Sequence, residues 1–233
     1  MAEIFRSTIL ARALRPLPLA FALGWATFGG FTGAMLRSHP ALDPVTAMYV
    51  LVAFMGLIGL DVENGGLHLI LTRRITRNQY LAGRLLAAFC LCFVFCLFRF
   101  AVTCGITAWA GPGRFPPTSE LLAVLIAWLG ASAWQLGVLF FCSTFLPGRL
   151  DSFVYWLLLV ANALVAGLGE MLDKPWLTAL TDWIGDQLLN PLEIWAFDAT
   201  TGWGLVRFAS NLTVVVLAGV LIFHRRQFSY AAG

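Results

Sequence analysis

The polar residues of this sequence are spaced in ways that exclude the common kinds of catalytic site. The three histidines, His39, His68 and His224, are far apart, and neither an H-E-x-x-H nor a G-x-S-x-G motif occurs. No G-x-x-x-x-G-K-[ST] loop is present, because the only lysine, Lys174, precedes a proline. We therefore expect no catalytic residue, no cofactor and no ATP site in this chain.

The thiol groups also lie where we expect no chemistry. All five cysteines stand inside apolar stretches: Cys90, Cys92, Cys96, Cys104 and Cys142. Buried thiols in such surroundings act as small hydrophobic side chains. Cys90 and Cys92 form a C-x-C pair, but a zinc site needs further ligands. The sequence predicts neither a metal site nor a disulfide framework.

A charged segment, residues 61–84, separates two apolar stretches. It opens with two carboxylates and two glycines, continues with the leucine-rich residues 67–71, and turns through an Arg-Arg pair. Thr76 and Gln79 have the spacing of a capping box, which marks the start of a helix near Arg77. This order predicts a short amphipathic helix at the membrane surface, a turn, and a helix that enters the membrane. A plain loop with stop-transfer arginines is the alternative.

The composition determines which elements must position these residues. The chain has 233 residues, of which 60% are hydrophobic and 12% charged, and its mean hydropathy is +0.82. Ordinary soluble domains are about 45–50% apolar and about 25% charged. The net charge of +3 is spread between apolar stretches, unlike the basic face of a nucleic-acid-binding protein. We therefore predict an all-α membrane protein with one domain, residues 1–233, and no nucleic-acid partner.

The apolar stretches predict six transmembrane helices. A short amphipathic helix over residues 1–15 is expected to lie on the membrane surface before the first of them. The first apolar stretch is too long for a cleavable signal peptide. The predicted spans cover about 17–36, 45–60, 78–110, 121–146, 153–169 and 205–223.

The basic residues between the spans predict the orientation. Short loops on the cytoplasmic side carry an excess of Lys and Arg. One side would hold ten such residues: Arg6, Arg12, Arg15, Arg73, Arg74, Arg77, Arg84, Arg149, Arg225 and Arg226. The other would hold four: Arg37, Arg114, Lys174 and Arg207. Both termini are therefore expected in the cytoplasm, which agrees with an even number of spans.

The order of residues 61–86 resembles the ABC-2 type permease family. In that family a Glu and a Gly precede a short leucine-rich helix, a turn with [IV]-[ST]-R, and a Tyr, Gly and Arg or Lys on the next helix. The matching residues are Glu63, Gly66, Leu69 to Leu71, Ile75 to Arg77, Tyr80, Gly83 and Arg84. Arg74 replaces the usual proline of the turn, and residues 225–230 also resemble the family's ending. In residues the resemblance covers about a sixth of the chain.

This resemblance implies a permease subunit that dimerises, with itself or a second permease, and docks two ATP-binding subunits that hold ATP and Mg²⁺. Residues 1–15 and a cytoplasmic coupling helix between spans two and three would carry ATPase motion into the membrane. The coupling residues would be Glu63, Gly66, Leu69, Leu71, Arg73, Arg74, Thr76 and Arg77. The protein would lie in a bacterial-type inner membrane and would export a lipid, drug, peptide or other amphipathic molecule. Residues 170–204 have room for re-entrant helices between spans five and six, or form an aromatic belt.

Three residues within the predicted spans have two interpretations each. Arg99 lies about 22 Å along a helix from Arg84. It is either a residue of the substrate pathway, where it would suit an anionic group, or a structural charge paired with Glu170 or with helix-end carbonyls. Gly29 and Gly33 form a G-x-x-x-G motif, which fits either a dimer seam or packing within the chain.

Two other functions remain open at this stage. An integral membrane enzyme of lipid metabolism would need clustered Asp, His or Ser at the membrane surface, and the sequence shows no such cluster. A structural or assembly subunit of a larger membrane complex would need no chemistry at all.

Overall fold

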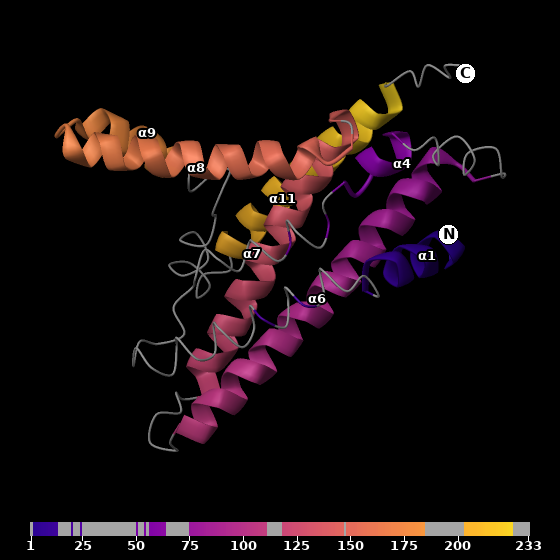
Figure 1. The fold of residues 1–233 in the computed structure, drawn as a ribbon, viewed down its shortest axis with the longest axis horizontal. Coiled ribbons are helices and arrows are strands. Elements are labelled where there is room, and N and C mark those ends of the chain that lie inside the picture. The colour runs from indigo at the N-terminus through magenta and orange to yellow at the C-terminus, as the bar shows by residue number, and fades with distance from the viewer. Residues whose placement is uncertain are drawn as a thin grey trace. The chain divides into compact units, whose positions relative to one another are not determined.

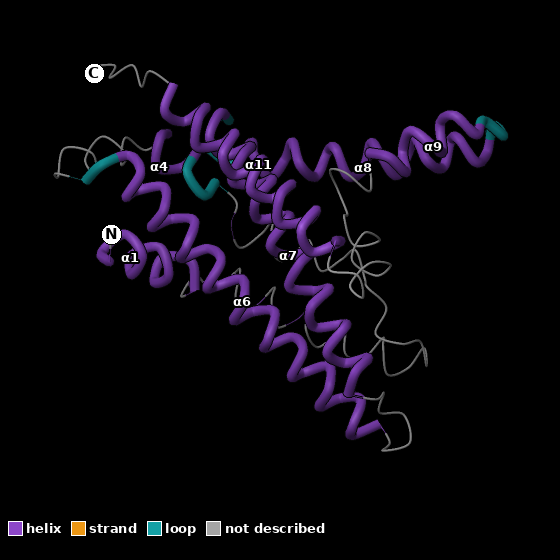
Figure 2. The backbone as a smooth tube through the Cα atoms, turned by 180° about the vertical axis from the view of Figure 1, so that it is seen from behind, coloured by secondary structure: helices purple, strands orange, loops and turns teal. Residues whose placement is uncertain are grey.

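The computed structural model consists of helices and the turns that join them (Figures 1 and 2). It describes residues 2–13, 20, 24, 50, 54, 56–63, 75–110, 118–146, 148–184 and 203–225, and no strand occurs in these ranges. The helices are α1 (Ala2–Ala13), α4 (Gly59–Glu63), α6 (Arg77–Ala110), α7 (Thr118–Phe145), α8 (Leu150–Met171), α9 (Pro175–Ile184) and α11 (Trp203–Arg225).

Four helices in the described part of the chain are long and apolar enough to cross a membrane. The segments are Arg77–Ile106, Trp128–Phe145, Leu150–Met171 and Gly204–Arg225. At a rise of about 1.5 Å per residue, even the shortest approaches the ~30 Å hydrocarbon thickness of a bilayer. Large apolar side chains on these helices, such as Phe153 and Leu217, are more than half exposed, as expected when the surrounding solvent is lipid.

These four helices agree with the spans predicted at 78–110, 121–146, 153–169 and 205–223 to within three residues at each end. The span predicted at 17–36 lies outside the described residues apart from Ala20 and Gly24. In the range 45–60, Val50 and Phe54 are helical, but residues 56–58 form a turn. Gly56 has φ +66°, a left-handed conformation that ends a helix, so the helix predicted over this range does not continue through residue 58.

The chain divides into two compact units, and each is described separately. Unit 1 comprises residues 1–54 and 82–136, and unit 2 comprises residues 55–81 and 137–233. In unit 1, α1 occupies most of the range predicted for a surface helix. It packs against α6 through Arg84, whose Nη1 donates a 3.0 Å hydrogen bond to the Thr8 hydroxyl. Thr8 and Ile4 are buried at this contact.

The capping box predicted from the sequence is confirmed in unit 2. The Gln79 backbone N–H donates to the Thr76 hydroxyl oxygen at 3.3 Å, and the Thr76 N–H donates to the Gln79 side-chain oxygen at 3.1 Å. These two bonds satisfy backbone N–H groups that the first turn of a helix leaves without partners. The box therefore explains why α6 begins at Arg77.

Unit 2 also contains a helical hairpin in which α9 folds back along α8 (Figure 2). The turn at residues 172–174 contains Asp173 at φ +50°. The two helices approach closely at Gly169, where an added Cβ atom would lie 3.0 Å from the Leu177 Cβ. At ten residues, α9 is about 15 Å long, half the thickness of a bilayer. α9 lies within residues 170–204, where re-entrant helices or an aromatic belt are expected, and only residues 170–184 and 203–204 of that range are described.

Candidate functional site

Two groups of contacts in unit 2 flank the predicted coupling segment, residues 63–77. The first group, which we call the aspartate anchor, consists of Gly56, Ile58, Gly59, Ser143, Gly148, Asp151 and Ser152. The second, the tyrosine anchor, consists of Asp61, Arg77, Asn78, Tyr80, Phe223 and His224.

Asp151 in the first turn of α8 is the centre of the aspartate anchor. Its side chain is fully buried, at 0% exposure. The two carboxylate oxygens accept hydrogen bonds from the Gly56 N–H at 3.1 and 3.0 Å, and one of them also accepts from the Ser152 N–H at 2.6 Å. Bonds from N–H groups to a carboxylate are stronger than those between neutral groups. Asp151 therefore ties the turn at residues 56–58 to the start of α8.

Ser143 in α7 holds the other N–H groups of the same turn. Its hydroxyl oxygen accepts from the Ile58 N–H at 2.8 Å and the Gly59 N–H at 3.1 Å. Ser143 is also a hydrogen-bond partner of the Asp151 side chain. Because buried backbone N–H groups are costly when left without acceptors, the two side chains specify the path of the chain into α4.

Glycines allow this turn to pack backbone against backbone. A Cβ atom on Gly59 would lie 2.5 Å from the Gly148 carbonyl oxygen and 3.0 Å from the Leu146 carbonyl oxygen. A Cβ atom on Gly56 would lie 2.9 Å from the same Gly148 oxygen. Any larger residue at position 59 must displace main chain rather than a flexible side chain. The start of α4 and the turn before α8 are thus held in direct contact.

Tyr80 is the centre of the tyrosine anchor and joins three helices. Its side chain is fully buried, at 0% exposure. The hydroxyl donates a 2.5 Å hydrogen bond to Asp61 Oδ2 in α4. The ring stacks on Phe223 in α11 with a centroid separation of 6.1 Å and an interplanar angle of 22°. Since Tyr80 belongs to the first turns of α6, one side chain connects α4, α6 and α11.

Two further contacts hold the beginning of α6 to the end of α11. Arg77 Nη1 donates to the backbone carbonyl oxygen of His224 at 3.1 Å. His224 Nε2 lies 2.5 Å from the side-chain oxygen of Asn78, within hydrogen-bond distance. The Arg77 guanidinium is a cation at the carboxyl end of α11, where it also interacts favourably with the dipole of that helix. Arg77 is therefore a structural contact as well as a predicted coupling residue.

The predicted coupling residues are only partly described. Glu63 is the last residue of α4, Thr76 caps α6, and Arg77 contacts α11. The other coupling residues lie outside the described residues: Gly66, Leu69, Leu71, Arg73 and Arg74. Gly29 and Gly33, predicted to pack helices or a dimer, also lie outside them.

Sequence reasoning did not single out Ser143, Asp151 or His224. Asp151 carried a signal that could have been used, because it is a carboxylate at the edge of an apolar stretch, where burial requires several hydrogen-bond donors. Ser143 carried none, since a serine within a transmembrane helix is common. Both act on a turn more than 80 residues earlier in the chain, with sequence separations of 95 for Asp151 to Gly56 and 85 for Ser143 to Ile58.

Arg99 is buried in unit 1, with 4% of its surface exposed. Its guanidinium carbon lies 4.3 Å from the centroid of the Trp128 ring in α7, a cation–π contact. Phe100 meets the same ring edge to face at 6.4 Å. The aromatic partner was not predicted from the sequence, and Glu170, proposed there as a carboxylate partner, is exposed near the end of α8.

Within the described residues, no three His, Cys, Asp or Glu side chains are grouped as a metal site would need. The described cysteines are free thiols: Cys90, Cys92, Cys96, Cys104 and Cys142. In comparisons with known proteins, no protein-family model and no curated protein matches this chain.

Proposed function

We propose that this chain is the membrane-spanning permease subunit of an ATP-driven exporter of the ABC-2 type, and that a separate subunit hydrolyses ATP. The observation that supports the proposal is the position of the two anchors. They lie at the two ends of the predicted coupling segment and tie it to α6, α8 and α11. A loop that only joined two spans would not need buried contacts to three membrane helices.

The two anchors connect the coupling segment mechanically to α6, α8 and α11. If an ATPase subunit displaces the segment, the force is transmitted to α4 at one end of the segment and to Arg77 at the other. Breaking a buried bond that leaves a polar group unsatisfied costs about 1–3 kcal/mol. Several such bonds hold the turn and α4, so a displacement moves the ends of α8, α6 and α11 together with the segment. This coupled movement would change the opening of a translocation pathway.

The orientation in this proposal follows from the positive-inside rule. The excess of arginines places both termini and the coupling segment on the cytoplasmic side of a bacterial-type inner membrane. The four candidate spans of the described residues would be completed to six by two within residues 17–60. Two permease copies, identical or different, would assemble with two ATP-binding subunits and export an amphipathic substrate.

The proposal is tested by purifying the tagged chain from its native membranes and identifying the proteins that accompany it. The expected companion is a P-loop ATPase whose ATP hydrolysis rises when the permease is present in lipid nanodiscs. Glu63→Ala and Arg77→Ala should lower this stimulation while the complex still assembles. Arg149→Ala is the matched control, because Arg149 is exposed and belongs to neither anchor. Absence of any ATPase, or full stimulation by both variants, would reject the proposal.

A further inference from the structure

One side of α11 is an exposed apolar face. Val214, Leu217 and Leu221 are spaced by three and four residues, so they lie on the same side of the helix. Each of the three is 54–61% exposed, whereas Phe223, on the opposite side, is fully buried within unit 2. Because α11 is a candidate membrane span, this face is expected to contact lipid acyl chains.

A cation lies at the carboxyl end of this face. Arg225 follows Leu221 by four residues, or about one helical turn, and its side chain is exposed. It has no hydrogen-bond or ion-pair partner among the residues that the structure describes. Arg77 at the same end of α11 is already engaged, because it donates to the His224 carbonyl oxygen. Arg225 is therefore the cation that this helix end offers to a ligand in the membrane.

The length of the face matches one leaflet of a membrane. Arg225 follows Val214 by eleven residues, which is about 16 Å of helix and close to half of a ~30 Å hydrocarbon layer. Arg225 is the last residue of α11, so its guanidinium lies at the depth of the phosphate groups when the apolar face lies among the acyl chains. The positive-inside rule places this end of α11 at the inner leaflet.

The charge of α11 favours an anionic headgroup. The helix contains no Asp or Glu, and its last turn carries His224 and Arg225. An arginine near the membrane surface attracts anionic lipids, whereas a zwitterionic headgroup adds a cation of its own beside the phosphate. A guanidinium also forms charge-assisted hydrogen bonds with phosphate oxygens. An anionic phospholipid therefore complements both the apolar face and the charge at its end.

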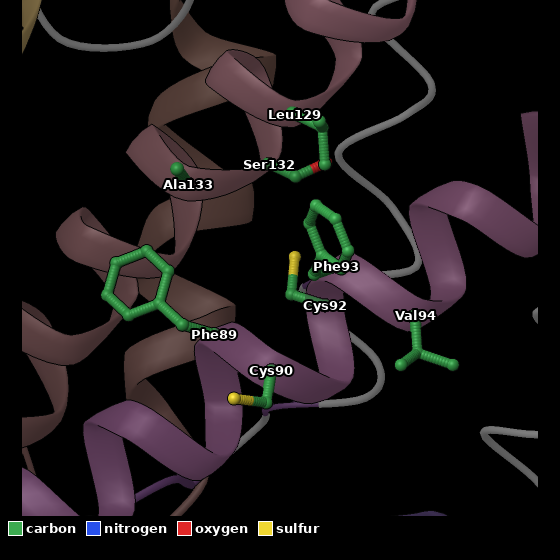
Figure 3. A pocket seen from close by; sticks show the side chains of 8 residues that line it. All are labelled: Phe89, Cys90, Cys92, Phe93, Val94, Leu129, Ser132 and Ala133. Carbon is green, nitrogen blue, oxygen red and sulfur yellow. The ribbon is translucent and has the colours of Figure 1, made fainter.

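A second apolar surface provides a comparison, because it has no cation. Figure 3 shows a groove of about 530 Å³ between α6 and α7 in unit 1. Its α6 side includes Phe89, Cys90 and Phe93, and its α7 side includes Leu129 and Ser132. None of the residues that line this groove is charged. Acyl chains in the groove should therefore show no preference for an anionic headgroup.

We propose that the exposed face of α11 and Arg225 form a binding site for an anionic phospholipid of the inner leaflet. One acyl chain lies along Val214, Leu217 and Leu221, and the Arg225 guanidinium donates hydrogen bonds to the phosphate. This inference depends on the membrane location of α11, but not on an ATPase partner. It can therefore fail while the proposed transport function stands, and the reverse also holds.

The test measures lipid contact at position 221 itself. In a variant of the full chain without its native cysteines, Leu221→Cys carries a bimane label whose fluorescence is quenched by brominated acyl chains. Brominated phosphatidylglycerol should compete with unbrominated phosphatidylcholine about fivefold better than brominated phosphatidylcholine does, the factor expected for one cation near an anionic lipid. Adding Arg225→Gln should reduce this ratio to about one, whereas Arg225→Lys, which keeps the charge, should retain most of it.

Two controls separate this site from general effects of charge. Arg207→Gln removes an exposed cation from the other end of α11 and should leave the ratio at position 221 unchanged. A label on the native Cys90, which is exposed and lines the groove in Figure 3, should report a ratio of about one. A ratio of about one at position 221 with Arg225 in place would refute the proposal.

Other occupants of the face give a different result. If a second copy of this chain or an ATPase subunit covers it, neither brominated lipid quenches the label at position 221, and the proposal is wrong. A second measurement, which keeps the native cysteines, is native mass spectrometry of the delipidated full chain with phosphatidylglycerol and phosphatidylcholine of identical acyl chains. Arg225→Gln should lower the preference for phosphatidylglycerol more than Arg149→Gln, which removes another exposed arginine. Equal effects of the two substitutions would reject a specific site at Arg225.

Discussion

The hydroxyl of Tyr80 donates a 2.5 Å hydrogen bond to the carboxylate of Asp61, across 19 residues of sequence. The two residues flank the predicted coupling segment, so this bond closes the segment into a loop. The Phe223 ring, which stacks on Tyr80, extends the contact to the end of α11. The two contacts therefore hold α4, α6 and α11 together beside the segment.

Tyr80→Phe should keep the stacked ring and lose only the hydrogen bond to Asp61. We expect a loss of about 1–2 kcal/mol of stability, because a hydrogen bond to a charged group is removed. In a detergent thermal melt this corresponds to a fall of about 2–8 °C for a chain of this size. A double-mutant cycle with Asp61→Asn isolates the pair. Additive effects of the two substitutions would show that the bond contributes nothing.

Asp151→Asn should loosen the turn at residues 56–58. An amide has one oxygen acceptor in place of the two that receive N–H groups in the native structure. The expected loss is about 2–3 kcal/mol, as for hydrogen bonds to a buried charged group. Hydrogen–deuterium exchange should show faster exchange of the Gly56 amide.

The control for this substitution is Asp173→Asn. Asp173 is exposed in the turn between α8 and α9 with φ +50°, a conformation that asparagine also adopts readily. The stability and the hydrogen–deuterium exchange pattern of the Asp173→Asn variant should match those of the wild type. Unchanged exchange at Gly56 in Asp151→Asn would contradict the anchor described above.

Gly59→Ala should be strongly destabilising, because the new methyl group would lie 2.5 Å from a backbone oxygen of Gly148. We expect a cost of at least about 2 kcal/mol from the displaced main chain. Gly167→Ala is the matched comparison, since no atom lies within 4 Å of a Cβ atom there. In a helix this second change should be neutral or stabilising by up to about 1 kcal/mol. Equal melting temperatures for the two variants would refute the close approach.

Single cysteines introduced into a cysteine-free variant test the orientation. Arg149→Cys, before α8, and Asp173→Cys, after it, lie at opposite ends of one candidate span. With cytoplasmic termini and six spans, a membrane-impermeant maleimide added to intact cells should label position 173 and not position 149. Permeabilised cells should allow labelling of both. The opposite pattern in intact cells would reverse the orientation and exclude a cytoplasmic coupling segment.

The sequence by itself determined the class of protein and the helices of its described part. Long apolar stretches leave a helix as the best way to satisfy backbone N–H and C=O groups in lipid, so composition alone predicts α6, α7, α8 and α11 closely. The capping box at Thr76 and Gln79 is local, which is why the start of α6 was readable from four residues.

Only the tertiary structure decided which side chains meet. Asp151 bonds to Gly56, Tyr80 to Asp61, and Arg99 stacks on Trp128 across 29 residues of sequence. No local pattern encodes these pairs, because each depends on how helices distant in sequence pack together. The turn at Gly56 was missed for the same reason. An apolar stretch reads as continuous helix until a buried carboxylate and a serine from other helices accept the N–H groups that the turn releases.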